Sequence, residues 1–481
     1  MAKNRLQGKR VAVIGLGREG VELARFLAKQ EARVTILDRA SAKQLGKNYQ
    51  VMKAVGIDFE LGDKYLDNLA SFEIVYRSPG VPLELPALKQ ARKRGVEISS
   101  GTKLFLELCP AKVIGITGTK GKSTTASLVH HLLRGSLSLL RSAKAGTTGG
   151  QAATRGNKEK SRVYMAGNIG HSPLPLLGKL KRSDWVILEL SSFQLEDMTT
   201  SPNIAVLLNV VPEHLDRHKT FSRYLAAKKN IYLYQKRGDW LVASQDFPVL
   251  RQAAKETRAR VFPYSTHKIL RKGLYLAKGE IVYRQLNNGK RQSIAPIDKV
   301  PIRGEHNLQN VLAAIGVAIL GKIKPTQIAK RLASFRPLHH RLELVREIGG
   351  VRFINDSLAT TPEAATAAVQ TFDGEDIALI VGGVYKGGDI RQLAQVIERH
   401  SAIYVALIGE SANRFAKVLA QWAPSVHYEK SKDLKQAIKA AYASVKADGG
   451  VVVLAPACAS FDMFKDAYDR GEQFKIIAKT L

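Results

Sequence analysis

The residues whose types and spacing best suit them to chemistry lie at 113–125, where the chain reads Val-Ile-Gly-Ile-Thr-Gly-Thr-Lys-Gly-Lys-Ser-Thr-Thr. The apolar start predicts the end of a buried strand. The three glycines allow a tight turn whose backbone N–H groups can point at phosphate oxygens, with Lys122 reaching the terminal phosphates and the Ser123 hydroxyl binding Mg²⁺. The match is a variant, because five residues separate Gly115 from the Gly-Lys-Ser triplet. A glycine-rich connection without a ligand is the alternative.

Polar residues that can bind metals follow two further apolar segments. The segment 185–189 ends at Glu189, which suits a second Mg²⁺ ligand in a phosphate-loop fold. The segment 204–208 runs into Glu213 and His214. Open parallel sheets bind ligands where their strands end, so both positions predict a site beside the phosphate loop. The alternatives are a surface acid and a structural histidine.

Another glycine-rich turn lies near the N-terminus. Gly15, Gly17 and Gly20 follow an apolar strand and open a helix, and Asp38 ends the next strand. This fingerprint is typical of dinucleotide sites, where the acidic residue takes hydroxyl groups. It predicts that a nucleotide-like group binds here, with NAD as the first candidate. A plain βαβ unit without a ligand is the alternative.

Polar groups also end the strands of the C-terminal third, at 355–357, 382–389 and 456–462. The contrast between apolar strands and polar strand ends predicts a site. Ser357, Asp389 and Ser460 are equally plausible as helix caps.

The elements that must position these residues alternate between strands and helices. This pattern predicts an α/β protein with doubly wound, mostly parallel sheets. We expect a Rossmann-like domain at 1–109, a central phosphate-loop domain with β hairpins over 261–297 at 110–335, and a second Rossmann-like domain at 336–481. Residues 224–232 have a helical period, and on the pattern alone Lys228 is a solvated charge.

Composition limits the partners. The chain has 481 residues, 45% of them apolar, and 74 basic against 42 acidic residues give a net charge of +32, which favours anionic partners without choosing among them. Cys109 and Cys458 form no metal-spaced pair, so we expect buried thiols in a reducing compartment. No apolar run approaches 18 residues, and a cytoplasmic protein without membrane insertion is expected. The basic segment 134–162 is interpreted as a surface loop rather than a nucleic-acid contact.

Together these motifs resemble those of the Mur ligase family, and they follow the family order along the whole chain. The matching segments are 118–124, 167–170, 189–196, 213–218, 304–310, 340–341, 355–357 and 456–462. The resemblance implies ATP-dependent amide formation through an acyl phosphate. It points to the members that add D-glutamate to UDP-N-acetylmuramoyl-L-alanine in peptidoglycan precursor synthesis. It also implies a monomer that binds no nucleic acid.

The resemblance further implies roles for individual residues. The catalytic residues would be Lys122, His214 and Lys228. Two Mg²⁺ ions would be held by Ser123, Glu189, His214 and an N-carboxylated Lys228. ATP would contact Gly118, Thr119, Lys120, Gly121, Lys122, Ser123, Thr124, Asn307, Asn310, Arg341 and Asp356. The UDP end of the substrate, and not NAD, would contact Gly15, Leu16, Gly17, Asp38, Ser78, Pro79 and Gly80. The remaining substrate contacts would be Asn168 for phosphate, Ser191 and Gln194 for the sugar-peptide part, and Thr360, Lys386 and Ser460 for the incoming amino acid.

Departures from the family pattern leave the added amino acid open. Lys120 replaces a more usual Asn, Leu358 stands where a Lys often follows, and Ala467 stands where an aromatic residue is common. The alternative functions are therefore a sister ligase that adds another amino acid, such as L-glutamate, or a folylpolyglutamate synthetase. A basic phosphate-loop NTPase acting on nucleic acid explains only the charge, and an NAD dehydrogenase leaves the phosphate loop unexplained.

Overall fold

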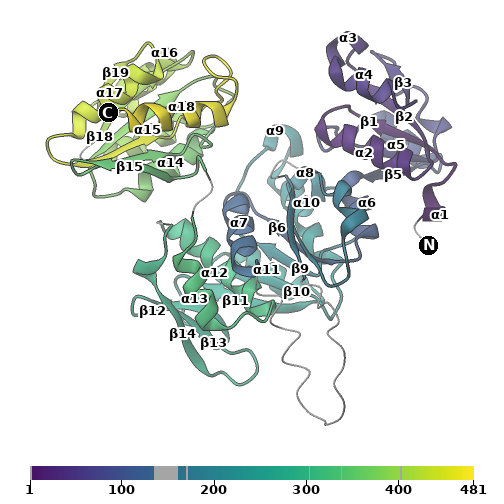
Figure 1. Cartoon of the computed structure of the whole chain (residues 1–481), viewed down its shortest axis with the longest axis horizontal. Coiled ribbons are helices and arrows are strands. Elements are labelled where there is room, and N and C mark those ends of the chain that lie inside the picture. Colours follow the sequence, from purple (N-terminus) through teal and green to yellow (C-terminus); the bar gives the residue numbers. More distant parts are fainter. Residues whose placement is uncertain (1–2, 135–160, 169–171, 303, 337–338, 401–402) are drawn as a thin grey trace, which may run out of the picture. The chain divides into compact units, whose positions relative to one another are not determined.

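The computed structural model of the protein describes residues 3–134, 161–168, 172–302, 304–336, 339–400 and 403–481 (Figure 1). These residues form three sheets surrounded by helices. One compact unit comprises 1–300 and 306–335, and the other comprises 301–305 and 336–481. The predicted α/β class with three parallel-rich domains is confirmed. The domain limits at 109 and 335 stay predictions.

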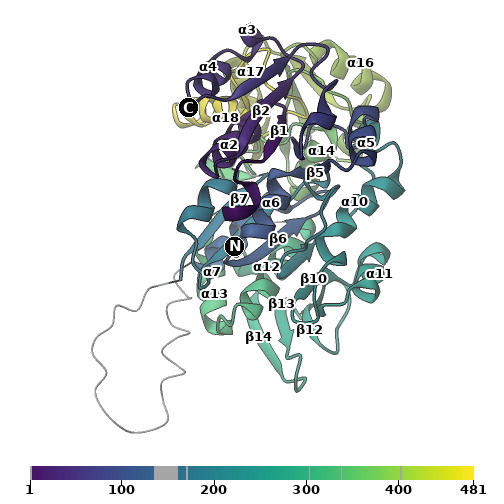
Figure 2. The same ribbon diagram turned by 90° about the vertical axis from the view of Figure 1, so that its right-hand side faces the viewer.

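The N-terminal sheet is fully parallel, with strand order β3-β2-β1-β4-β5. Its strands are β1 (Arg10–Ile14), β2 (Arg33–Asp38), β3 (Asp58–Leu61), β4 (Ile74–Arg77) and β5 (Glu97–Ser100). Its helices are α1 (Lys3–Leu6), α2 (Arg18–Lys29), α3 (Ala42–Leu45), α4 (Lys47–Lys53), η1 (Leu69–Ser71), α5 (Pro86–Lys93) and α6 (Gly101–Leu108). Figure 2 shows α2 beside β1 and β2. The strand order reverses between β1 and β4, which creates a crevice at their carboxyl ends.

Strand β4 begins at Ile74. Phe72, two residues earlier, follows the short helix η1 and is buried.

The central sheet has the order β14-β13-β12-β11-β10-β9-β6-β8-β7. Its strands are β6 (Lys112–Thr117), β7 (Val163–Gly167), β8 (Trp185–Glu189), β9 (Ile204–Leu207), β10 (Trp240–Ser244), β11 (Arg260–Ser265), β12 (Gly273–Ala277), β13 (Glu280–Arg284) and β14 (Arg291–Pro296). Its helices are α7 (Lys122–Leu133), η3 (Leu174–Lys179), α8 (Ser192–Leu195), α9 (Leu215–His218), α10 (Phe221–Leu233), α11 (Pro248–Glu256), η4 (Ile297–Lys299), α12 (Glu305–Leu320) and α13 (Pro325–Ala333). The strands around the phosphate loop are parallel and deeply buried, as expected when helices cover both faces.

The predicted hairpins at 261–297 are partly confirmed. Strands β12, β13 and β14 are antiparallel neighbours, and the turn at 287–289 joins the last two. Strand β11 differs, because it pairs parallel to both β10 and β12 and so extends the parallel sheet.

The C-terminal sheet has the order β15-β16-β20-β17-β18-β19, and only β15 is antiparallel to its neighbour. Its strands are β15 (Glu343–Ile348), β16 (Val351–Asn355), β17 (Ile377–Gly382), β18 (Ile403–Ile408), β19 (His427–Lys430) and β20 (Gly450–Leu454). Its helices are α14 (Pro362–Thr371), α15 (Ile390–Arg399), α16 (Ala412–Trp422), α17 (Leu434–Val445) and α18 (Ala467–Lys479).

The N-terminal and central sheets share one hydrophobic core, which explains why they form a single unit. Leu23 of α2, Phe105 of α6 and Leu174 of η3 belong to the same buried cluster as Leu188 of β8. Gly101 begins α6 within van der Waals distance of the Leu174 side chain, since a Cβ there would lie 3.4 Å from its Cδ1. The two glycine-rich turns from different sheets thereby belong to one compact unit.

Three further expectations can be compared with the structure. Most of the basic segment 134–162 lies outside the described residues. Cys458 is buried as expected, whereas Cys109 is partly exposed, and both are free thiols. Among the described helices, none combines the length and apolar character needed to cross a bilayer.

Candidate functional site

The phosphate-type loop joins β6 to α7. Gly121 has φ +83 and caps the helix, and a Cβ on it would overlap the side chain of Asn310. Gly115 lies inside β6, the strand expected at 113–116. A Cβ on Gly115 would lie 2.5 Å from the Pro202 ring, so this glycine serves close packing.

Asn209 holds the loop from the end of β9. Its Oδ1 accepts a hydrogen bond from the Lys120 backbone N–H at 2.9 Å, and its Nδ2 donates to the Lys120 carbonyl at 3.1 Å. Its own carbonyl accepts from Thr119 N–H at 2.7 Å. Sequence reasoning did not select Asn209, although its place after an apolar strand was the available signal.

Two lysine side chains converge on the loop. Lys122 Nζ donates to the carbonyls of Gly118 at 3.0 Å and Thr119 at 2.9 Å. Lys228 Nζ, from α10, donates to the same Gly118 carbonyl at 2.9 Å and lies 3.4 Å from Thr117 Oγ1. Both cations therefore lie where a nucleotide phosphate would approach the loop.

The expectation from the pattern that Lys228 is solvated is wrong. Its relative exposure is 2%, because the helix turns this face onto β6 and the loop. Burial and the neighbouring Lys122 charge lower the pKa of Lys228 to about 7, against a smaller opposing effect of Glu213. A neutral amine is therefore accessible near pH 7.

Glu189 ends β8 as predicted and is 2% exposed. Its Oε1 accepts from Asn168 Nδ2 at 2.7 Å, while its buried Oε2 has no hydrogen-bond partner among the described residues. A buried carboxylate oxygen without a donor suits a cation ligand. Ser123, in the first turn of α7, is partly exposed.

His214 has a positive φ of 54°. Its Nε2 is 3.7 Å from Glu213 Oε2, and Lys120 Nζ is 3.3 Å from the other oxygen of that carboxylate. The His214 side chain is 48% exposed, so its ring remains accessible. No group of three or more His, Cys, Asp or Glu side chains suited to a metal is found among the described residues.

The N-terminal turn lines a pocket of about 500 Å³. Leu16 N–H donates to Asp38 Oδ2 at 2.7 Å, and Ala40 N–H donates to Oδ1 at 2.8 Å. Both Asp38 oxygens thus accept hydrogen bonds from backbone N–H groups. The predicted contacts with hydroxyl groups of a ligand would use the remaining lone pairs of these oxygens. Gly15 has φ +92, and Ser78 Oγ donates to its carbonyl at 3.2 Å.

The pocket also collects residues of the central sheet. Its full lining is Gly15, Leu16, Gly17, Glu19, Gly20, Asp38, Ser78, Pro79, Gly80, Val81, Gly167, Asn168 and Ser172. The structure therefore brings together the predicted N-terminal residues and Asn168, whose side chain reaches Glu189.

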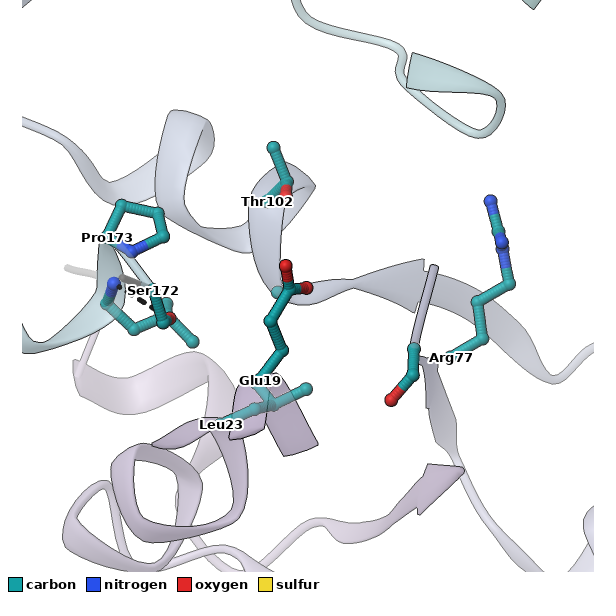
Figure 3. Close-up of a pocket in the computed structure, with 9 residues that line it drawn as sticks. Glu19, Leu23, Arg77, Thr102, Ser172 and Pro173 are labelled. Atoms are coloured by element: carbon teal, nitrogen blue, oxygen red, sulfur yellow. Dashed lines mark hydrogen bonds between the residues drawn. The ribbon is translucent and has the colours of Figure 1, made fainter. Parts of the chain in front are cut away.

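Ser191 and Gln194 form a capping box at the start of α8. Ser191 Oγ accepts from the Gln194 N–H at 3.2 Å, and Gln194 Oε1 accepts from the Ser191 N–H at 3.0 Å. Gln194 Nε2 donates to Glu19 Oε1 at 3.0 Å. Figure 3 shows Glu19 extending from α2 into the space between Thr102 and Arg77. These two residues therefore have a structural role of their own.

Asn307 and Asn310 lie one turn apart on α12 and are buried. Asn310 Nδ2 donates to Asn307 Oδ1 at 3.2 Å, and Thr125 Oγ1 donates to Asn310 Oδ1 at 3.3 Å. The pair thus packs against the phosphate loop and the helix that follows it.

The second unit carries the other predicted residues. Burial raises the pKa of Asp356 to about 6, opposed by the nearby Arg341 charge. Asp356 Oδ1 accepts from Leu342 N–H at 3.3 Å. The two predicted residues are therefore close enough to interact at the end of β16.

Lys386 and Ser460 lie on neighbouring loops after β17 and β20, which a bridge between Val384 and Ala459 joins. Lys386 Nζ lies 4.8 Å from the centre of the Phe461 ring. Ser460 Oγ is buried without a hydrogen-bond partner among the described residues.

The region that carries Thr360 adjoins the same loops, since the Ala457 N–H donates to the Ala359 carbonyl at 2.8 Å. Of the three possible caps, Asp389 caps α15, accepting from Arg391 and Gln392 N–H groups. Ser357 instead contacts Arg470, accepting from its Nε at 3.0 Å. The capping alternative thus holds for Asp389, and neither Ser357 nor Ser460 caps a described helix.

Comparison with known proteins gives matches along nearly the whole chain. The matching family models are "Mur ligase MurD-like, N-terminal domain" at 9–100, "Mur ligase middle domain" at 116–318 and "Mur ligase, glutamate ligase domain" at 340–458. A UDP-N-acetylmuramoylalanine–D-glutamate ligase of Acetivibrio thermocellus is 36% identical, with 100% of this chain and 98% of that protein covered. The protein of the same name from Acidobacterium capsulatum is 36% identical, with 98% and 96% covered.

Solved structures share the fold. The UDP-N-acetylmuramate-alanine ligase MurC of Thermotoga maritima has a TM-score of 0.55 at 17% identity and covers 98% of this chain and 99% of its own. The MurF ligase of Thermotoga maritima in complex with ADP has a TM-score of 0.55 at 18% identity, with 100% and 97% covered.

Proposed function

The chain belongs to the Mur ligase family, and we propose that it uses ATP to join D-glutamate to UDP-N-acetylmuramoyl-L-alanine during synthesis of the peptidoglycan precursor. The full-length relatives that carry the name of this ligase support the choice of substrate. The observation that carries the chemistry is the convergence of Lys122, Lys228 and Glu189 on the carboxyl edge of β6 and β8.

A carboxylate is a poor acylating group, and phosphorylation makes it reactive. In the proposed reaction the substrate carboxylate attacks the γ-phosphate of ATP, and ADP leaves. The amine of D-glutamate then attacks the acyl phosphate, and the tetrahedral intermediate expels phosphate as the amide forms. Lys122 and the loop N–H groups would neutralise the two anions that must meet in the first step.

The donor set fits Mg²⁺. Ser123 and Glu189 would hold one ion, and His214 with an N-carboxylated Lys228 would hold the other. Bound Mg²⁺ would supply further neutralisation of the phosphate oxygens. The unpartnered Glu189 Oε2 and the accessible His214 ring support this proposal.

The low pKa of Lys228 supports its N-carboxylation. A neutral lysine amine attacks CO₂, forms an N–C bond and releases a proton, leaving a carbamate anion. Burial of Lys228 makes the neutral amine accessible near pH 7. The carbamate would replace a cation beside Lys122 with an anion, which relieves the repulsion between the two lysines.

The other substrate contacts are proposed from the same family resemblance. The remaining ATP-site residues are Gly118, Thr119, Lys120, Gly121, Thr124, Asn307, Asn310, Arg341 and Asp356. The UDP end would occupy the pocket lined by Gly15, Leu16, Gly17, Asp38, Ser78, Pro79 and Gly80. Asn168, Ser191 and Gln194 would face the phosphate and sugar-peptide parts. Thr360, Lys386 and Ser460 would bind the carboxylates of D-glutamate.

A phosphate-release assay with a panel of amino acids tests the proposal. Release should require ATP, UDP-N-acetylmuramoyl-L-alanine and D-glutamate together, and mass spectrometry should show the amide product. Release with L-glutamate or another amino acid would identify the sister ligase instead. Release stimulated by DNA, or oxidation of NADH, would overturn the assignment. Sedimentation of the purified protein checks the proposed monomer.

A further inference from the structure

Arg77 is a fully buried cation between the N-terminal pocket and the central sheet. It is the last residue of β4, its side chain is 0% exposed, and it directly precedes the pocket residue Ser78. Nothing in the proposed reaction uses it, although a buried guanidinium is costly without partners.

The Arg77 guanidinium donates hydrogen bonds both to the turn of the N-terminal pocket and to the central domain. Nη1 donates to the Val81 carbonyl at 2.9 Å, which closes the turn that contains Ser78. Nη2 donates to the Phe193 carbonyl in α8 at 3.1 Å. The planar fork of arginine suits such a double contact, which the single ammonium of lysine cannot reproduce.

Two carboxylates of the central domain neutralise it. Arg77 Nη2 lies 3.3 Å from Glu196 Oε2, and Arg77 Nε lies 3.4 Å from Asp197 Oδ2. Ser100 Oγ donates to the other Asp197 oxygen at 3.3 Å. Segment 193–197 cannot move away from Arg77 without leaving buried charges unpaired.

A small cavity lies beside Arg77. The adjoining cavity, lined by residues that include Glu19, Thr102 and Ser172, measures about 10 Å³ (Figure 3). A cavity of this size holds at most about one water molecule.

The ring of Phe193 continues the contact towards the proposed metal site. It lies 5.1 Å from the His214 ring and 5.2 Å from the His218 ring, measured between centroids. Arg217 Cζ lies 5.5 Å from its centre, and Arg217 Nη1 donates to the Gly80 carbonyl at 3.2 Å. Phe193 is therefore held on one side by Arg77 and touches the loop of His214 on the other.

We infer that Arg77 is a positioning residue that couples the N-terminal pocket to the reacting centre. It ties the turn at 78–81 to Phe193, so that the turn proposed to hold the UDP end also fixes α8 and the loop of His214. Binding at a remote part of the substrate then serves to orient the reacting carboxylate. The inference rests on the proposed function, because only that function places the turn at 78–81 and the loop of His214 at opposite ends of one substrate.

The test compares two substrates in Arg77→Met, Arg77→Lys and Asp197→Asn. One is UDP-N-acetylmuramoyl-L-alanine, and the other is 1-phospho-N-acetylmuramoyl-L-alanine, which lacks the uridylyl group. Coupling predicts that kcat for the full substrate falls about 100-fold in Arg77→Met and about 10-fold in the other two, because remote binding no longer orients the carboxylate. For the truncated substrate kcat should change less than about 3-fold, since that contribution is already absent.

A purely structural role would lower kcat for both substrates by the same factor, and that result overturns the inference. Arg25→Met is the matched control, because Arg25 is 45% exposed in α2 and should leave both substrates unaffected. If Arg77→Met fails to fold by circular dichroism, Arg77→Lys and Asp197→Asn decide the question. If the unmodified protein turns over neither substrate, the proposed function itself fails.

Discussion

Two glycine-rich turns, one at Gly15–Gly20 and one at Gly118–Gly121, join a buried strand to a helix but are held in opposite ways. In the N-terminal turn, the carboxylate of Asp38 accepts the Leu16 N–H. In the central turn, the neutral amide of Asn209 accepts the Lys120 N–H. The first turn is therefore held by an anionic side chain and the second by a neutral one.

The two turns also differ in the basic side chains that surround them. Lys122 and Lys228 both point at the Gly118 carbonyl. The lining residues that the structure describes for the N-terminal pocket include Asp38 and Glu19 but no lysine or arginine. The two glycine-rich turns therefore differ in the charge of the side chain that holds them and in the lysines that approach them.

The sharpest way to break the comparison is to remove the lysine of the central loop. Lys122→Ala should lower phosphate release about 1,000-fold or more, because the charge that neutralises the γ-phosphate is lost. Lys112 lies at the exposed start of β6, the strand that precedes this loop. Lys112→Ala is therefore the control and should retain activity. Wild-type turnover in Lys122→Ala contradicts the assignment.

Removing Lys228 tests whether the reaction depends on the carbamate anion that this lysine is proposed to form with CO₂. Lys228→Ala should lose about 100-fold or more in kcat and regain part of it with added formate or acetate, since the missing group is a carboxylate. Lys229→Ala, whose side chain pairs with Glu256, is the neighbouring control. A folded Lys228→Ala protein without rescue counts against N-carboxylation.

The same lysine predicts a pH dependence. Only the neutral amine reacts with CO₂, and its pKa is lowered to about 7, so activity should rise as the pH increases from 6 to 8. The unfolded chain keeps this proton up to about pH 10.5, so the free energy of unfolding should also rise with pH between about 7 and 10. Paired activity and denaturant titrations of the wild type and Lys228→Met measure both effects, and identical profiles would exclude Lys228 as the source.

Exchanging Asn209 and Asp38 for each other's residue type tests whether the charge of the acceptor determines which substrate each turn binds. Asn209→Asp places a carboxylate beside the central loop and should raise KM for ATP about 10-fold or more, with a smaller effect on the UDP substrate. Asp38→Asn keeps only one acceptor oxygen and should raise KM for the UDP substrate about 10-fold while KM for ATP stays constant. Steady-state kinetics with each substrate varied in turn would show the selectivity, and equal effects on both would refute it.

The smallest expected effects are changes in the free energy of unfolding when alanine replaces one glycine of each turn. Gly121→Ala should lower the free energy of unfolding by about 3 kcal/mol, because φ is positive and the new methyl group meets Asn310. Gly17→Ala should change it by less than about 0.5 kcal/mol, since φ is −72° and nothing lies within 4 Å. Denaturant unfolding measures both, and similar values would contradict this account.

Much of the fold could be predicted from the sequence. The alternation of apolar strands with helices, the three sheets and the turns at Gly15 and Gly121 follow from local patterns, because periodicity and glycine conformations depend on neighbouring residues. The parallel pairing of β11 could not be predicted. Which strands pair depends on contacts between residues that are distant in the sequence.

The sequence by itself determined which residue types stand at the strand ends, and hence that a glycine-rich turn opening a helix has polar neighbours. Only the tertiary structure decided that Lys228 is buried, that Asn209 holds the loop, and that Arg77 meets Phe193. These contacts join residues 110, 89 and 116 positions apart. Such contacts are set by strand order and helix packing, and no local pattern carries that information.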